Sequence, residues 1–264
     1  MTGTVLLHRA DGVATIEIDR PQSRNALTAG MTRQLTDIVG SLAEDVSVKV
    51  VAITAAGRDF CAGADMGDIE AAISPDPATR ASSFTTGLPS SVHPLLHALL
   101  ALPQPVVAAV RGHAIGLGVA IALTADLLVV SETARFSVPQ VRLGHTLDHG
   151  ESWLLPRRVG VAQAARMSLL AEPLAASAAE RHGLAGWLVV DDELESTSRE
   201  LVDQLLALPA PAVIATKRLL RSSFDMSLGD QLDSEVREAA ACATTDEFVE
   251  AVRAAMSPTR RRTT

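Results

Sequence analysis

The sequence predicts one large domain of mixed α/β structure, and three observations support this. The chain has 264 residues and is 47% apolar, enough for a single well-buried core. Residues 12–18 and 48–54 have the pattern of strands, and a helical pattern lies between them. Residues 105–110 then form an apolar strand-like run, which leads through a glycine-interrupted turn at 112–118 into an apolar helix-like run at 119–124.

The first elements follow from local signals. Asp11 and Gly12 form a turn before the alternating strand 12–18. Thr28 is suited to be the N-cap of an amphipathic helix over 29–43, where apolar residues recur at helical spacing. A β-branched run predicts the next strand, over 48–54.

The rest of the chain is predicted to be mainly helical. Residues 73–91 are rich in Ser, Pro and Thr and predict an exposed, mobile segment. Two pairs of residues have the spacing of capping boxes, Ser227 with Asp230 and Thr244 with Glu247. The other expected elements are helices at 92–102, 154–160, 175–183, 201–208, 212–222 and 228–241, and strands at 126–130 and 187–190.

Composition excludes several function classes. The net charge of −8 and the absence of tyrosine argue against nucleic-acid binding, which uses a basic face and stacking aromatics. The longest uncharged apolar run is too short to span a membrane, and the first residues lack a signal-peptide pattern. Two distant cysteines fit a reducing cytoplasm, and Cys61 is expected to be a buried, inert thiol rather than a nucleophile. His93 and His97 share a helix face, but no third ligand is signalled and no metal is expected.

Two glycine- and alanine-rich stretches follow predicted strands. One is the turn at 112–118, and the other lies within residues 53–66. Small residues permit close backbone approach, and a helix that begins at such a turn directs free N–H groups outward. Two such sites could supply two N–H donors to one carbonyl oxygen. A tight turn without any ligand is the alternative reading of the first stretch.

Four motifs in order carry a family resemblance: DRPQSRNALTAGM (19–31), FCAGADM (60–66), AVRGHAIGLG (109–118) and FSVPQVRLG (136–144). They resemble the crotonase superfamily, which includes enoyl-CoA hydratases and isomerases, over residues 7 to 256. The resemblance implies a ββα spiral core that binds acyl-CoA, at 1–195, and a C-terminal helical region for oligomerisation and pocket cover, at 196–264. It further implies a homotrimer or a dimer of trimers, and no cofactor apart from the coenzyme A of the substrate.

The resemblance also assigns residues. The backbone N–H groups of Ala64 and Leu117 would hold the thioester oxygen, with Leu117 standing where the family usually has glycine. At the C-terminus the usual Lys-containing ending is replaced by residues 255–259, and Arg260–Arg262 are expected to form a solvated tail. The positions implied to contact substrate or coenzyme A are Arg24, Ala26, Ala62, Asp65, Met66, Gly116, Gly118, Pro139, Gln140 and Leu143.

The acid–base residues depart from the hydratase pattern. Hydratases of the family use two glutamates, and the matching positions here hold Ala120 and Gln140, neither of which can act as a base. A carboxylate follows at Asp148, which matches the aspartate of the family's dienoyl-CoA and ring-epoxide isomerases. Asp148 could instead cap the following helix. His149 and Glu151 could assist Asp148 or lie at the surface.

These residues favour an enoyl-CoA isomerase that uses Asp148 as its base. Three alternatives remain at this stage: a hydratase with rearranged roles, an acyl-CoA-binding protein without turnover, and hydrolytic or dehalogenating chemistry. The last would use Asp148 as nucleophile with help from His93.

Overall fold

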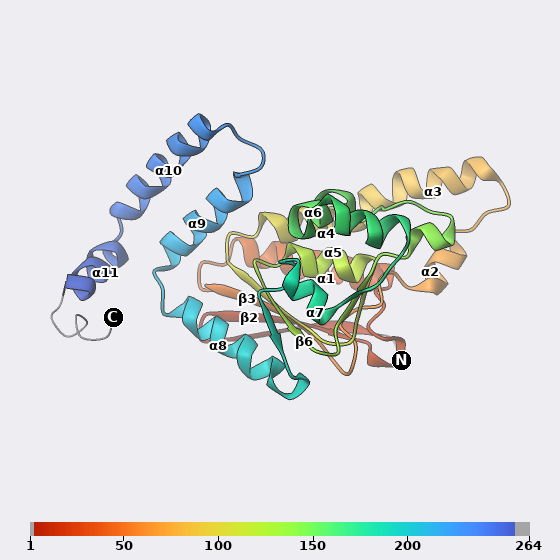
Figure 1. The fold of residues 1–264 in the computed structure, drawn as a ribbon, viewed down its shortest axis with the longest axis horizontal. Coiled ribbons are helices and arrows are strands. Elements are labelled where there is room, and N and C mark those ends of the chain that lie inside the picture. Colours follow the sequence, from red (N-terminus) through yellow and green to blue (C-terminus); the bar gives the residue numbers. More distant parts are fainter. Residues whose placement is uncertain (1–2, 257–264) are drawn as a thin grey trace.

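The computed structural model describes residues 3–256 and contains two sheets with helices packed around them (Figure 1). The larger sheet has the strand order β1-β2-β3-β4-β6-β9 and the smaller one the order β5-β7-β8. In the larger sheet β1 is antiparallel to β2, and the other neighbours are parallel. The strands are β1 (Thr4–Ala10), β2 (Val13–Asp19), β3 (Val50–Ala55), β4 (Val106–Val110), β5 (His113–Ile115), β6 (Leu127–Ser131), β7 (Arg135–Ser137), β8 (Leu174–Ala175) and β9 (Trp187–Val189).

Helices connect the strands and make up the C-terminal region. The parallel pairing needs such crossover connections. The α-helices are α1 (Ala29–Ala43), α2 (Met66–Ala71), α3 (Pro77–Ser90), α4 (Val92–Ala101), α5 (Leu117–Thr124), α6 (Glu151–Leu169), α7 (Ala176–Arg181), α8 (Leu194–Leu206), α9 (Ala210–Ser222), α10 (Leu228–Ala243) and α11 (Asp246–Met256), and the 3-10 helices are η1 (Pro21–Ser23), η2 (Gln140–Leu143) and η3 (Asp191–Glu193).

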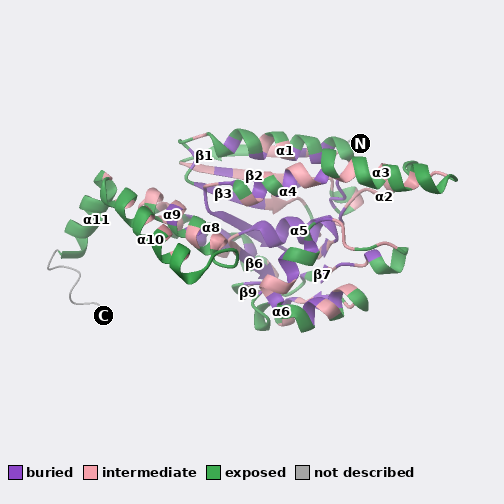
Figure 2. Cartoon of the chain, turned by 90° about the horizontal axis from the view of Figure 1, so that it is seen from above, coloured by how far each residue is buried: buried purple, intermediate pink, exposed green. Residues whose placement is uncertain are grey.

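The mixed α/β prediction is confirmed. All residues of β4 are buried, as expected for a central parallel strand that is covered on both faces. All residues of α5 are buried as well, so this helix lies inside the core, and Figure 2 shows it in purple. The core therefore fixes the turn between β5 and α5, where the candidate site begins.

Several local predictions are confirmed, whereas those for residues 73–91 and for the capping pair Thr244 and Glu247 need correction. Thr28 caps α1, and its side chain accepts a hydrogen bond from the N–H of Met31. The segment 73–91 is exposed, as predicted, but most of it is helical: Asp76 caps α3, and the hydroxyls of Ser83 and Thr86 donate to carbonyls one turn earlier. Near residue 245 the hydroxyl of Thr245 rather than Thr244 accepts from the N–H of Phe248 at the start of α11.

The C-terminal helices extend away from the sheets. In Figures 1 and 2, α10 and α11 lie beyond α9, and they are mostly exposed. Within residues 3–256, no helix combines the length and the apolar character needed to cross a membrane. The division at residue 195 stays a prediction, and the tail at Arg260–Arg262 lies outside the described residues. Large apolar side chains are nevertheless exposed along this region, at Leu220, Phe224, Leu228, Val236, Phe248 and Met256.

A buried charge cluster attaches α9 to the core. The ammonium of Lys217 lies 2.7 Å from the Asp126 carboxylate and donates to the carbonyl of Gln104 at 2.6 Å. The carboxylate of Asp126 also pairs with Arg221 at 2.7 Å. Because Lys217 is only 8% exposed, water cannot replace these contacts.

Replacing Lys217 with Met is expected to lower the free energy of unfolding by about 2 kcal/mol, because the partly buried Asp126 and the carbonyl of buried Gln104 both lose a charged donor. Chemical denaturation measures the change. Arg218→Met is the control on the same helix, since Arg218 pairs with Glu238 at the surface and should cost less than about 1 kcal/mol. Equal losses in the two variants would contradict this account.

Candidate active site

Two backbone segments meet beside the N-terminus of α5. The N–H of Cys61 donates to the carbonyl of His113, and the N–H of Ile115 donates to the carbonyl of Cys61, both at 2.9 Å. Gly63 has a φ of +93°, and a Cβ there would lie 2.7 Å from the carbonyl oxygen of Ile115 and 3.7 Å from the backbone nitrogen of Leu117. Glycine is therefore required for the two segments to touch.

The N–H groups of Ala64 and Leu117 lie on these touching segments. Leu117 is the first residue of α5, so its N–H has no partner within the helix. The carbonyl of Gly63 accepts from the N–H of Leu27 at 2.8 Å, and the N–H of Asp65 donates to the carbonyl of Leu27 at 2.9 Å. The N–H of Ala64, which lies between them in the chain, takes no part in this pairing. Among residues 3–256, neither of these two N–H groups has a hydrogen-bond acceptor. The side chain of Leu117 is packed in the core.

A buried asparagine holds the neighbouring loop that carries Arg24 and Ala26. The amide of Asn25 donates to the carbonyls of Ala56 and Asp59, and its oxygen accepts from the N–H of Arg20. Arg24 and Asn25 both have positive φ, a strained conformation that these bonds stabilise. The guanidinium of Arg24 is 64% exposed and directed so that its Nε lies 3.9 Å from Asp59.

The other predicted contact residues differ in their surroundings. Asp65 caps α2 and pairs with Arg20, so its carboxylate already has partners within the fold. Met66 and Leu143 are exposed, at 60% and 63%. The carbonyl of Arg24 accepts from the N–H of Ala62, which joins two of the predicted positions.

Cys61 is buried, and burial raises the pKa of its thiol to about 12. This agrees with the expectation of an inert thiol, because the nucleophilic thiolate is disfavoured. Gly118 packs against the carbonyl of Cys61 so closely that a Cβ would overlap it. Ala120, at the position of one hydratase glutamate, is buried one turn into α5.

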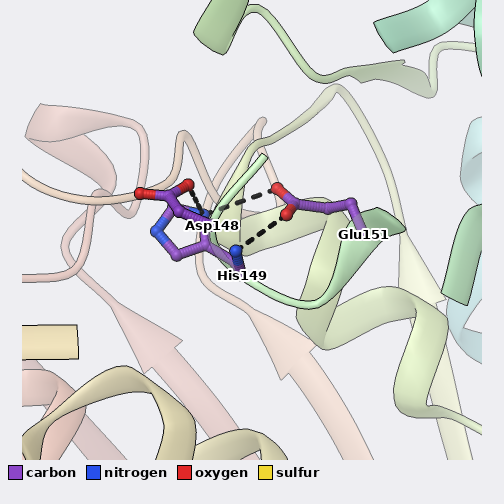
Figure 3. Close-up of side chains that lie close together, drawn as sticks. All are labelled: Asp148, His149 and Glu151. Carbon is purple, nitrogen blue, oxygen red and sulfur yellow. Dashed lines mark hydrogen bonds and ion pairs between the residues drawn. The ribbon is translucent and has the colours of Figure 1, made fainter. Parts of the chain in front are cut away.

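The side chains of Asp148, His149 and Glu151 gather just before and at the start of α6; we call them the acid–imidazole cluster. The Nδ1 atom of His149 lies 3.3 Å from Asp148 Oδ1 and 3.4 Å from Glu151 Oε1 (Figure 3). Asp148 does not cap the helix, because the N-cap is Gly150 and no side chain bonds there. The capping alternative for Asp148 is therefore wrong, and its carboxylate is available for other contacts.

The acid–imidazole cluster adjoins the turn that precedes Leu117. A Cβ on Gly116 would lie 3.8 Å from Nε2 of Gln140 and 4.0 Å from Nδ1 of His149. Gln140 lies in η2, where it donates to Oε1 of Glu151 at 2.6 Å. The fold thus brings together the turn, Gln140 and the cluster, which are up to 35 residues apart in the chain.

Burial and charge act in opposite directions on this cluster. Burial by itself lowers the pKa of His149, but contact with the Glu151 carboxylate and the charge of Asp148 outweigh it and raise the pKa. Burial by itself raises the pKa of Glu151. The hydrogen bond and the charge of His149, together with backbone N–H groups, outweigh burial and lower this pKa. The arrangement favours an imidazolium beside an ionised Glu151.

Three buried polar atoms near the turn have no hydrogen-bond partner among the described residues: Gln140 Oε1, Asp148 Oδ1 and His149 Nδ1. Such atoms are costly unless a ligand or water satisfies them. Each of the three residues also has one potential ligand atom, and these atoms lie within 4.8 Å of one another. An imidazolium has no lone pair to offer a cation, however, so protonated His149 does not complete a metal site. The absence of a metal, expected from the sequence, stays a prediction.

Two helices border the cluster. From α4, Nε2 of His93 lies 3.4 Å from the carbonyl of Asp148. From α3, the ring of Phe84 stacks on His145 with centroids 4.4 Å apart, and His145 lies 3.7 Å from Oδ2 of Asp148. The segment 73–91 therefore contributes an aromatic wall near the candidate base.

Comparisons with known proteins agree with this architecture. A sequence model described as enoyl-CoA hydratase/isomerase matches residues 8–256. The 1,2-epoxyphenylacetyl-CoA isomerase of Escherichia coli is 34% identical over 88% of this chain and 87% of its own length. The carnitinyl-CoA dehydratase of Proteus mirabilis is 32% identical over 86% and 84%. The crystal structure of an enoyl-CoA hydratase from Mycobacterium smegmatis superposes with a TM-score of 0.86 at 29% identity, over 95% of each chain.

The fold and these matches define a crotonase-type protein. The chain belongs to the enoyl-CoA hydratase/isomerase family. The match to the family extends through the C-terminal helices to the end of α11.

His149 and Glu151, for which the sequence allowed either a role beside Asp148 or a surface position, are 8% and 0% exposed. Their signal was the spacing around Gly150, whose φ of +76° turns the chain so that both side chains return toward Asp148. Glycine is the residue that adopts this conformation without strain.

Proposed function

We propose that the protein is an enoyl-CoA isomerase that moves a double bond through a thioester enolate. The N–H groups of Ala64 and Leu117 hold the thioester oxygen, and Asp148 is the base. The observation that carries this proposal is the contact between two backbone segments with free N–H groups, next to a largely buried carboxylate. Donors fixed in advance stabilise charge as it develops on oxygen.

The proton transfers balance with one carboxylate. Asp148 takes a proton from a carbon next to the thioester carbonyl, and the electron pair moves onto the thioester oxygen. The enolate then collapses, and Asp148 returns the proton two carbons further along the acyl chain. Because the same group takes and gives the proton, the reaction needs no second carboxylate at Ala120 or Gln140.

The substrate contacts follow the family pattern. The exposed Arg24 is proposed to contact the coenzyme A phosphates or adenine, and Ala26, Ala62, Gly116 and Gly118 supply a close-fitting backbone. The proposal also includes further contacts to substrate or coenzyme A around that backbone, at Asp65, Met66, Pro139, Gln140 and Leu143. Coenzyme A is part of the substrate, so the proposal includes no separate cofactor.

Hydration is a second candidate, because His149 places another acid–base group 3.3 Å from Asp148. Hydration needs two such groups to hold and split water. The names of the hydratase and dehydratase relatives agree with this possibility.

Incubating the protein with 3-enoyl-CoA and 2-enoyl-CoA thioesters, aryl-substituted ones included, separates the candidates. Isomerisation leaves the product mass unchanged and moves the double bond, which mass spectrometry and chromatography against standards detect. A product heavier by one water molecule would show that the protein is a hydratase and not an isomerase. Binding by calorimetry without any conversion across the panel would leave only the role of acyl-CoA carrier.

We also propose self-association as a homotrimer or a dimer of trimers, through the exposed apolar residues of α9–α11. Large unburied apolar surfaces mark interaction sites. Sedimentation of the protein at micromolar concentration tests this, and a monomer would contradict it. Two free cysteines accord with the proposed cytoplasmic location.

A further inference from the structure

His149 lies between two carboxylates and is at nearly the same distance from each. Its Nδ1 atom is 3.3 Å from Asp148 and 3.4 Å from Glu151, and it makes a full hydrogen bond to neither. An N–H shared between two oxygens at these distances makes only a weak hydrogen bond to each. A positive charge on the imidazole, in contrast, stabilises both carboxylates together.

Glu151 is the fixed negative charge of this group. Its side chain is fully buried, and its oxygens accept from Nε2 of Gln140 at 2.6 Å and from the N–H of His149 at 2.9 Å. A buried carboxylate that accepts such donors remains ionised. Its oxygen lies within 4.8 Å of the reacting carboxylate of Asp148, close enough for strong repulsion between the two anions.

This inference rests on the proposed function. We propose that His149 is a positioning residue: its imidazolium stands between Glu151 and Asp148 and keeps Asp148 ionised, so that Asp148 can act as the base. His149 acts through Asp148 and need not touch the substrate.

Other charged groups face Asp148 less directly. His145 lies 3.7 Å from its other oxygen, but the side chain of His145 is 31% exposed, so solvent weakens the interaction. His93, on α4, contacts the backbone carbonyl of Asp148 rather than the carboxylate. The N-terminus of α5, at Gly116, contributes a partial positive charge that substitutions at His149 and Glu151 leave in place.

The charges of the cluster change simply during turnover. Before reaction the cluster carries one net negative charge, with two carboxylates and one imidazolium. When Asp148 takes the substrate proton, the imidazolium and Glu151 remain as a neutral ion pair. When Asp148 returns the proton to carbon, the starting charges are restored. The imidazolium keeps its proton throughout.

The test is the pH dependence of kcat/KM for isomerisation by His149→Asn. Asparagine can place an N–H near the position of Nδ1 but carries no charge. With Glu151 still ionised, the acid limb of the profile should move to higher pH by about one unit or more. The double variant His149→Asn/Glu151→Gln removes both charges, and its acid limb should move back toward that of the unaltered protein.

His8→Asn is the matched control, because the side chain of His8 on β1 is 60% exposed and pairs with Glu17 on β2 at 3.4 Å. Its acid limb should coincide with that of the unaltered protein. Thermal melts establish that each variant folds. An unmoved acid limb in a folded His149→Asn, or the same shift in the single and double variants, would overturn the proposal.

A second readout separates failure of this inference from failure of the proposed function. NMR titration follows the ring protons of His149, identified by their loss in His149→Asn. The titration midpoint of His149 should fall in Glu151→Gln, whatever reaction the protein catalyses. An unchanged midpoint would overturn the inference even if isomerisation is observed, and a shifted midpoint without isomerisation would remove the proposed function alone.

Discussion

Asp148→Asn is expected to lower kcat for double-bond isomerisation by between about 10²- and 10⁴-fold, the usual contribution of a general base. Asparagine keeps the shape of the side chain and cannot take a proton from carbon. Acyl-CoA binding should remain, since the predicted contacts to coenzyme A lie on other segments. Steady-state kinetics with a 3-enoyl-CoA, together with calorimetric binding, measure the two quantities separately.

The control for this variant is Asp45→Asn. Asp45 pairs with Arg9 at 2.7 Å near the end of α1, away from the acid–imidazole cluster. Its kcat should match that of the unaltered protein. If Asp148→Asn isomerised the substrate as fast as this control, Asp148 could not be the base, and His149 would become the group to test next.

Gly118→Ala is expected to lower kcat by about 10²- to 10³-fold, the effect of losing one oxyanion donor. The added methyl group would overlap the carbonyl of Cys61 and push α5 away from the segment that carries Ala64. Overpacking of this kind also costs about 1–3 kcal/mol of stability. Thermal melting and kinetics together report both effects.

Gly40→Ala is the matched control, because Gly40 lies in α1 with nothing within 4 Å of the Cβ position. This change should leave kcat unaltered and raise stability by about 0.5–1 kcal/mol through helix propensity. A Gly118→Ala protein as active as Gly40→Ala would mean that contact between the two segments is not needed for catalysis.

Much of the fold could be predicted from local sequence. The bounds of α1 follow from the N-cap Thr28 and from apolar spacing, and the structure reproduces them. The apolar run of residues 105–110 predicted a strand, and the structure shows this strand as the fully buried β4. Such features depend on neighbours in the chain, which the sequence displays directly.

Other features depend on contacts between distant segments. The strand β1 pairs with β2 along its whole length, although its own pattern is half exposed and did not indicate a strand. The helix α3 has no buried residue and a composition rich in Ser and Thr, so neither periodicity nor propensity identified it.

The candidate site was predictable in part for the same reason. Asp148 was predicted from its family position, but only the structure shows that Gly150 is the N-cap of α6 and that Asp148 does not cap this helix. The ionic contact of His149 with two carboxylates depends on the turn at Gly150 and on Gln140 from η2. No local pattern encodes a contact between a loop, a 3-10 helix and a helix terminus.

The two cysteines differ in a way that is useful for spectroscopy. Cys61 is sealed inside the junction of the two backbone segments, with its thiol protonated at ordinary pH, whereas Cys242 is partly exposed on α10. A maleimide dye or nitroxide should therefore react at Cys242 alone, without any engineering of the chain. If the proposed oligomer forms, the attached probe would report distances between the C-terminal helices of its subunits.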